Sequence, residues 1–348
     1  MTNDDVGNEA LESGSSRIDK ADVFLRRGIE NFYIDDFDVV IQDFNKAIEL
    51  NPMLAYAYYE RGEMYSFYKD DHDAAIRDFS KTIEIVPKYA RAYCSRGYAY
   101  SKKGDPDAAI RDFGKVIELT PMDYDAHLAR GQEYFLEKGD YDAAIRDIDK
   151  AIELDPDLGA LEYGLRGRIS LAKGDYDTAM QDFDGIVARN PRQPYPYYDR
   201  GRAYFAKGEY DAALLDFNQA IKMHPGFHDA LFERGRTHLA KGDREAAMQD
   251  FDAAITGYDN AFKRIPPANV SASDYYRRGK AYFAKGDCDA ALRDFDSAIV
   301  MRPMRLPPYY DRGKVHFAKG DYDAALRDLN KADPKYSAMS REELGCAL

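Results

Sequence analysis

Apolar side chains recur every three or four residues along most of this 348-residue chain, which is the spacing of helices with one buried face. The stretch from Leu306 to Phe317 shows this spacing, and a second periodic stretch runs from Ala324 to Leu329. Between them lie Gly320, which suits the left-handed turn after a helix, and Asp321, which suits the cap of the next helix. The pattern therefore predicts two helices joined by a tight turn.

The same two-helix pattern returns at a nearly constant period, and an Arg-Gly dipeptide marks each return. Successive glycines of this dipeptide are 34, 35, 34, 36, 34, 34, 44 and 34 residues apart. A fixed period near this length is typical of repeat proteins, in which each unit buries its apolar face against its neighbours. The nine glycines are Gly28, Gly62, Gly97, Gly131, Gly167, Gly201, Gly235, Gly279 and Gly313.

Each repeat also carries small and aromatic residues at matching positions, and these carry a resemblance to a known family. A small residue occupies one slot of the second helix in eight repeats, from Ala75 to Ala325, and an aromatic residue follows in most of them, from Phe44 to Phe295. With the glycines, these positions make the chain resemble the tetratricopeptide repeat family from about Ala21 to Pro334. Some positions depart from the family pattern: Asn31, Ser170, His238 and His316 stand in the aromatic slot of the first helix, and Val40 replaces the small residue.

The resemblance implies an all-α fold, a right-handed α-solenoid of helix-turn-helix units whose first helices line a concave, ligand-binding side. We expect a disordered tail over residues 1–16, nine repeats within residues 17–334 and a capping helix within residues 335–348 that begins near Ser340. The repeats are expected at approximately 21–54, 55–89, 90–123, 124–159, 160–193, 194–227, 228–271, 272–305 and 306–334.

The arginine before each glycine occupies a slot that the family usually fills with an apolar residue. Every repeat also has an aspartate just before the aromatic or aliphatic residue of its second helix. An unpaired buried charge would be too costly to repeat nine times, so we expect these arginines and aspartates to pair within or between repeats. The alternative is a ladder of guanidinium groups that binds an anion. The aspartates are Asp43, Asp78, Asp112, Asp147, Asp182, Asp216, Asp250, Asp294 and Asp328.

A second pattern concerns the residue that follows each of the nine glycines, on the expected exposed face of the first helix. In the first four repeats this residue varies, as Ile29, Glu63, Tyr98 and Gln132. In the last five repeats it is always basic. The basic residues are Arg168, Arg202, Arg236, Lys280 and Lys314.

Aromatic residues flank this basic stripe, and together they predict a groove for an extended, acidic peptide that also inserts apolar side chains. The alternative is that the rings pack against the neighbouring first helix, and that the cations pair with Asp199, Glu233 and Asp311 one turn earlier. The aromatic candidates for ligand contact are Tyr198, Phe205, Phe232, Tyr276, Phe283, Tyr310 and Phe317.

Composition, charge and the motifs present argue against nucleic-acid binding, membrane insertion and catalysis. The 49 lysines and arginines against 62 aspartates and glutamates argue against a general nucleic-acid binder. No long apolar stretch predicts a membrane span, and the acidic N-terminus does not resemble a signal peptide, so we expect a cytoplasmic protein. The sequence holds no catalytic, nucleotide-binding or metal motif, so we expect no enzyme activity, no cofactor and no metal.

We therefore predict a protein-interaction scaffold or adaptor that binds a peptide or protein segment in its concave groove. The alternative is a self-assembling structural protein that uses the repeat ends or the seventh repeat. That repeat is ten residues longer than the basic period, and its second helix continues through Ile255, Tyr258, Phe262 and Ile265 at helical spacing. The added apolar face needs a cover, either the next repeat or a partner.

Overall fold

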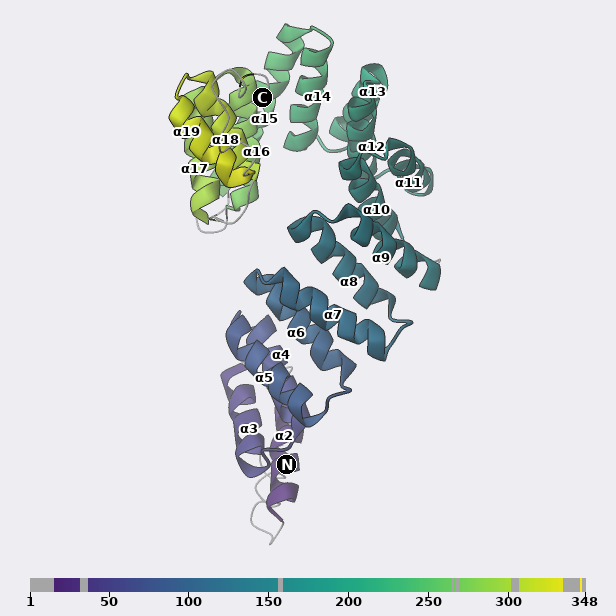
Figure 1. The fold of residues 1–348 in the computed structure, drawn as a ribbon, viewed down its shortest axis with the longest axis vertical. Helices are drawn as coiled ribbons and strands as arrows, with labels where there is room; N and C mark the ends of the chain where they lie inside the picture. Colours follow the sequence, from purple (N-terminus) through teal and green to yellow (C-terminus); the bar gives the residue numbers. More distant parts are fainter. Residues whose placement is uncertain are drawn as a thin grey trace. The chain divides into compact units, whose positions relative to one another are not determined.

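The computed structural model of the chain describes residues 16–31, 37–155, 159–264, 266, 270–301, 307–333 and 345. Throughout these residues the regular secondary structure is helical, with no β-strand. The chain divides into two compact parts, the N-terminal half (Met1–Gly174) and the C-terminal half (Asp175–Leu348). Each half is built from the same two-helix unit, in which the first helix is called helix A and the second helix B (Figure 1).

The described residues of the N-terminal half form four helix pairs and one further helix A. In each pair helix A packs against its own helix B, and helix B packs against the next helix A. The helices are α2 (Arg17–Glu30) with α3 (Phe37–Leu50), α4 (Ala55–Phe67) with α5 (His72–Ile85), α6 (Ala90–Lys103) with α7 (Pro106–Leu119), α8 (Tyr124–Glu133) with α9 (Tyr141–Leu154), and α10 (Ala160–Lys173).

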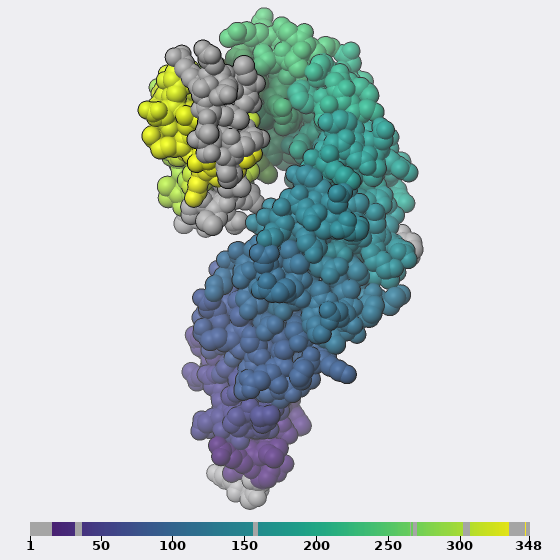
Figure 2. All heavy atoms as spheres, in the orientation of Figure 1, coloured from purple at the N-terminus to yellow at the C-terminus, as the bar shows by residue number. Residues whose placement is uncertain are grey.

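In the C-terminal half, the described residues begin with a helix B and continue with four pairs packed in the same order. Its helices are α11 (Tyr176–Arg189), α12 (Pro194–Lys207) with α13 (Tyr210–Met223), α14 (His228–Ala240) with α15 (Arg244–Arg264), α16 (Ala272–Lys285) with α17 (Cys288–Met301), and α18 (Pro307–Ala318) with α19 (Tyr322–Ala332). Within each half the predicted all-α solenoid is confirmed. Figure 2 shows that side chains fill the spaces between neighbouring helices of each half.

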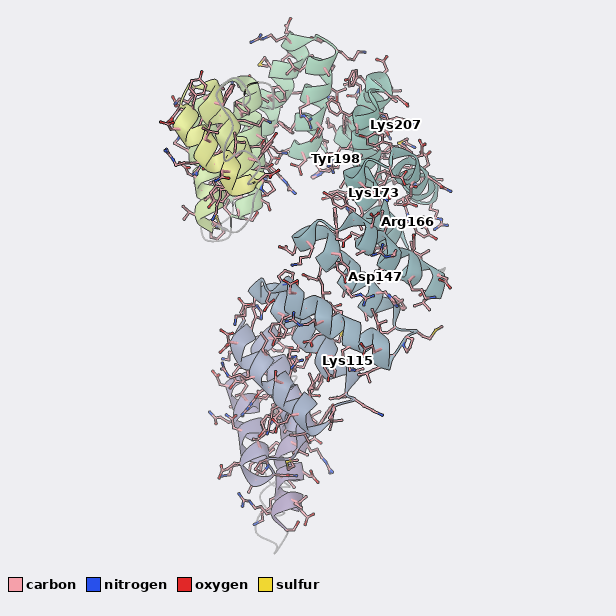
Figure 3. The ribbon with its side chains drawn as sticks, in the orientation of Figure 1. Lys115, Asp147, Arg166, Lys173, Tyr198 and Lys207 are labelled. Carbon is pink, nitrogen blue, oxygen red and sulfur yellow. The ribbon has the colours of Figure 1, made fainter. Side chains whose placement is uncertain are left out.

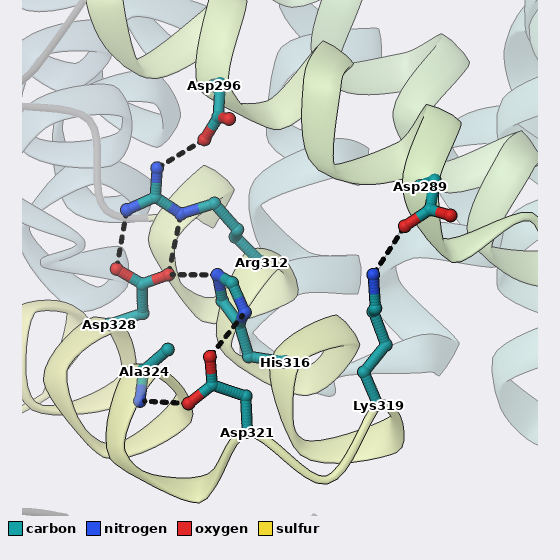
Figure 4. A network of polar contacts seen from close by, with 8 residues as sticks. All are labelled: Asp289, Asp296, Arg312, His316, Lys319, Asp321, Ala324 and Asp328. Atoms are coloured by element: carbon teal, nitrogen blue, oxygen red, sulfur yellow. Dashed lines mark hydrogen bonds and ion pairs between the residues drawn. The ribbon is translucent and has the colours of Figure 1, made fainter.

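The turns between helices A and B use the predicted glycine and aspartate. Gly320 has a φ of 82°, and Asp321 accepts a hydrogen bond from the backbone amide of Ala324 at 3.1 Å (Figure 4). Asp105 caps α7 in the same way, with Pro106 in the first position of the helix. These predictions are confirmed at both turns, and they explain why α7 and α19 begin where they do.

The glycine of the Arg-Gly dipeptide lets helix A approach helix B closely. A Cβ atom built on Gly201 would lie 2.7 Å from Cε1 of Phe217, a ring that is fully buried. The same contact joins Gly62 to Phe79. Because an interior at crystal density leaves no spare volume, no larger side chain fits at these positions without a shift of the ring.

Repeat four absorbs one extra residue as a π-helical turn. The left-handed glycine follows the Arg-Gly glycine by seven positions in most repeats, as in Gly201 and Gly208, but by eight in Gly131 and Gly139. The additional residue appears as the π-helix η2 (Tyr134–Lys138) at the end of α8. An insertion of one residue into a helix is commonly accommodated in this way.

The long helix α15 of repeat seven is covered by the next repeat. Phe262 packs edge-on against Tyr275 with ring centroids 5.0 Å apart, and the guanidinium of Arg278 lies 4.3 Å above the Phe262 ring. Tyr258 is buried and donates a hydrogen bond to Asp229. The expectation that the following repeat covers this face is confirmed at Phe262, while Asp229 belongs to the same repeat as Tyr258 and Ile265 lies outside the described residues.

The predicted N-terminal tail and the predicted C-terminal capping helix lie largely outside the described residues. Ser16, the last residue of the predicted tail, caps α2 by accepting a hydrogen bond from Asp19 at 3.1 Å. Residues 1–15 lie outside the described part. So does the predicted capping helix within residues 335–348, except for Gly345.

Replacement of the close-contact glycine is expected to destabilise the C-terminal half. Gly201→Ala should cost about 2 kcal/mol, because its methyl group overlaps the buried Phe217 ring. Gly185→Ala is the matched control within α11, since a Cβ at Gly185 meets nothing within 4 Å. The control should gain up to about 1 kcal/mol of helix propensity. Thermal unfolding measures both, and equal midpoints for the two variants would contradict the packing argument.

Candidate functional site

The repeated arginines are engaged by buried aspartates, so they form part of the scaffold. Arg200 donates from Nε to Oδ2 of Asp216 at 2.7 Å and from Nη2 to Oδ1 at 2.8 Å. The predicted pairing is confirmed for eight of the nine repeats; the arginine and aspartate of the remaining repeat, Arg166 and Asp182, lie in different halves. The eight pairs are Arg27–Asp43, Arg61–Asp78, Arg96–Asp112, Arg130–Asp147, Arg200–Asp216, Arg234–Asp250, Arg278–Asp294 and Arg312–Asp328.

Most of these arginines also reach back to helix B of the preceding repeat. Arg312 donates from Nη1 to Asp296 on α17 at 2.6 Å while it holds Asp328 on α19 (Figure 4). One side chain thus joins two neighbouring repeats, which supports the structural interpretation over an anion-binding ladder. The partners in the preceding helix B are Asn45, Ser80, Asp149, Asp184, Asn218, Asp259 and Asp296.

The two carboxylates that share Arg200 should differ in their effect on stability. Asp216 is 5% exposed, and Asp216→Asn should cost about 3 kcal/mol because it leaves the guanidinium without its buried counter-charge. Asp184 has a side chain that is 56% exposed, and Asp184→Asn should cost less than about 1 kcal/mol. Denaturant unfolding of the two variants makes the comparison, and a larger loss for Asp184→Asn would refute this assignment of roles.

The basic stripe of the C-terminal half lies on four neighbouring A helices, α12, α14, α16 and α18, which contact one another in sequence. We call their exposed surface the C-terminal helix-A face. It carries Arg202, Arg236, Lys280 and Lys314. Arg168, the fifth predicted cation, is exposed on α10 in the N-terminal half.

Three of these cations have a partner on their own helix. Arg236 donates to Glu233 at 2.7 Å, and Lys314 donates to Asp311 at 3.4 Å. Arg202 lies 3.7 Å from Asp199. These contacts match the internally paired alternative, in which each cation is neutralised one turn earlier.

Lys280 differs from the other three cations because its repeat breaks the pattern. The position one turn earlier holds Arg277, whose guanidinium pairs with Asp229 on α14 at 3.3 Å. Within the described part of the chain, Lys280 makes no hydrogen bond and no ion pair. Its ammonium lies 5.2 Å from the ring centroid of Phe232 and 5.1 Å from that of Tyr276. Burial lowers the pKa of Lys280 below its ordinary value, so this cation is poorly solvated.

The rings one turn before the cations are anchored mainly against their own helix B. Phe232 lies 5.7 Å from Phe251, and Tyr276 lies 5.9 Å from Phe295. Tyr198, labelled in Figure 3, also contacts Phe227, the N-cap residue of α14, with ring centroids 4.9 Å apart. These rings form rigid walls beside the cations, which suits a preformed binding surface.

Of the remaining predicted aromatic residues, two contact cations of this face and two pack toward helix B of their own repeat. Phe205 is covered by the guanidinium of Arg236 at 4.7 Å. Tyr310 lies beneath the Lys314 ammonium at 5.3 Å, and Phe317 packs against Tyr322 at 5.3 Å. Phe283 packs on the cluster around Phe295. All seven rings therefore belong to the four repeats that carry the stripe.

Sequence reasoning missed a buried glutamate on α8. Glu133 is only 9% exposed, it accepts a hydrogen bond from Ser101, and its second carboxylate oxygen has no partner among the described residues. Burial raises the pKa of Glu133 above its ordinary value. The corresponding slot holds Ala99 or Ala203 in other repeats, which was a signal available in the sequence.

Removal of the Glu133 charge should stabilise the protein at neutral pH. Because the folded-state pKa is raised, ionisation of Glu133 opposes folding once the pH exceeds the ordinary value of 4.5. Glu133→Gln should therefore gain about 1 kcal/mol at pH 7, and the gain should vanish below pH 4.5. Thermal unfolding across this pH range measures the difference; a gain that does not depend on pH would show that charge is not the cause.

Comparison with known proteins agrees with this architecture. The sequence model of the tetratricopeptide repeat family matches residues 94–158, 133–194, 198–262 and 276–339, which together cover more than half of the chain. The chain belongs to the tetratricopeptide repeat family. No curated protein matches it.

Solved structures of the same fold include a tetratricopeptide repeat protein from Parabacteroides merdae ATCC 43184. It is 19% identical, has a TM-score of 0.55, and the match covers 68% of this chain and 92% of that one. MamA is 28% identical with a TM-score of 0.43, over 48% of this chain and 96% of its own. YrrB, described as a TPR protein with an unusual peptide-binding site, is 23% identical with a TM-score of 0.43, and the match covers 51% of this chain and 91% of YrrB.

Family membership and the helical stack support a protein-interaction scaffold. In the described part of the chain, no helix is long and apolar enough to cross a membrane. Among the same residues, no group of three or more histidine, cysteine, aspartate or glutamate side chains could hold a metal ion.

Proposed function

We propose that the C-terminal helix-A face binds an extended peptide or protein segment that carries acidic and apolar side chains. The observation that carries this proposal is Lys280, a half-buried cation between two aromatic rings with no ion-pair partner among the described residues. Burial lowers the pKa of Lys280 more than the nearby carboxylates of Glu233 and Asp311 raise it, so a charge held here without an ion pair opposes folding. A carboxylate from a ligand would remove that cost, so its binding at this point is favoured.

The neighbouring residues would set which segments bind. Phe232 and Tyr276 offer apolar surface on both sides of the ammonium. Arg236 and Lys314 are already paired with carboxylates on their own helices, so they would contribute weaker, longer-range attraction to an acidic ligand. In this role the chain acts as a scaffold or adaptor, and no catalytic step is involved.

Replacement of Lys280 should separate binding from folding. Lys280→Met keeps the length of the side chain and leaves no carboxylate without a partner, since Lys280 has no acidic partner. A fluorescent peptide of repeated Glu-Phe-Ser triplets is the probe, and anisotropy measures its binding. The variant should bind the probe roughly tenfold or more weakly than the wild-type chain. Its thermal midpoint should rise, because a desolvated charge has been removed.

A charge-matched control keeps this test specific. Lys222→Met removes one cation from the exposed end of α13, a helix B outside the proposed surface. This control should bind the acidic probe as tightly as the wild-type chain. Equal binding by wild type and Lys280→Met, or no binding by the wild type, would overturn the proposal.

A further inference from the structure

The A helices of the N-terminal half carry a surface of opposite charge, built on tyrosines. Tyr59 and Glu63 lie on α4, Tyr98 lies on α6, and Asp125 lies on α8. Helices α4 and α6 contact each other, and the Tyr59 hydroxyl lies 3.4 Å from the hydroxyl of Ser95 on α6. We call this surface the tyrosine–acid face.

Its carboxylates lack the cations that neutralise acids elsewhere. Glu60, Glu63 and Asp125 have no ion pair with any described residue, whereas Glu233 and Asp311 of the C-terminal helix-A face are each paired with a cation. One carboxylate oxygen of Glu63 is fully buried and has no hydrogen-bond partner among the described residues. Such an acceptor opposes folding until a donor reaches it.

The pKa values of these carboxyl groups show the same excess of negative charge. Burial raises the pKa of Glu63, and the nearby Glu60 raises it further. Burial also raises the pKa of Asp125, with Asp123 and Glu162 acting in the same direction. Like charges therefore lie near one another on α4, and again between Asp125 on α8 and Glu162 on α10, and a bound cation would relieve the repulsion at either place.

Exposed aromatic rings lie among these carboxylates. The side chain of Tyr98 is 47% exposed and rests on Phe113 with ring centroids 5.1 Å apart, and Tyr56 is 42% exposed. Tyr59 packs against Tyr89 at 5.2 Å. The face of an aromatic ring attracts an ammonium or guanidinium group, and rings held by packing lose little freedom on binding.

We propose that the tyrosine–acid face docks a cationic protein segment, with a lysine or arginine side chain of that segment at Glu63 beside the tyrosine rings. The complementary charge identifies the partner as basic. The spread of the carboxylates over α4, α8 and α10 suits an extended segment better than a single small cation. This site lies in the other half of the chain from Lys280, so the protein carries two separate recognition surfaces of opposite sign.

The test uses a probe that mirrors the acidic peptide. A fluorescent peptide of repeated Lys-Phe-Ser triplets is titrated with the full chain at low salt, and anisotropy measures its binding. Glu63→Gln keeps the shape of the side chain and removes its charge; it should weaken this probe roughly tenfold. Tyr98→Ala should weaken it as well, because the ring lies on the surface with its exposed part free for contact.

Control variants distinguish this site from a general attraction between charges. Glu153→Gln removes an exposed charge from α9, a helix B, and should leave binding of the basic probe unchanged. Lys280→Met should also leave it unchanged, so this proposal and the proposed function can fail independently. Equal loss in Glu63→Gln and Glu153→Gln would overturn the site. Failure of the wild-type chain to bind the basic probe would overturn it too.

Discussion

The repeated arginine–aspartate pair is the interaction on which the rest of the structure depends. In the C-terminal half, Arg200 holds Asp216 in its own repeat and Asp184 in the preceding one, so a single side chain fixes both the angle within a repeat and the contact between repeats. A buried pair of charges is a weak source of stability compared with apolar packing, but breaking it is costly. The fully buried Phe217 ring against Gly201 supplies the apolar packing beside it.

This arrangement separates the charges that build the solenoid from those available for recognition. A charge that recurs in every repeat meets a partner that also recurs, as Arg312 meets Asp328. Recognition is therefore left to positions where a single repeat departs from the pattern. Lys280 is such a position. Arg236 and Lys314 each pair with an acid three residues earlier, whereas the residue three positions before Lys280 is Arg277. Glu63 is another such position, since it is half-buried and makes no ion pair with any described residue.

Much of the fold could be predicted from the sequence, because its determinants are local and repeated. The period of the Arg-Gly dipeptide, the turn at Gly320 and the cap at Asp321 each follow from residues within one repeat. The candidate site was harder to predict from the sequence, because its properties depend on contacts between residues of adjacent repeats. The pairing of Arg236 with Glu233 can be predicted because both residues lie on one helix. The lack of an ion pair at Lys280 also depends on a contact between two helices, in which Arg277 pairs with Asp229 of the preceding helix A. The burial of Glu133 likewise depends on how α8 packs.

The role proposed for Lys280 is tested by carbodiimide coupling of the acidic Glu-Phe-Ser peptide to the full chain, followed by mass-spectrometric mapping of the amide bonds that form. The coupling joins a carboxylate to an amine only when the two are in contact. We expect Lys280 to be the main site, because it is the cation of the C-terminal helix-A face that makes no ion pair within the described residues. Coupling spread over exposed helix-B lysines such as Lys222 and Lys331, with none at Lys280, would contradict it.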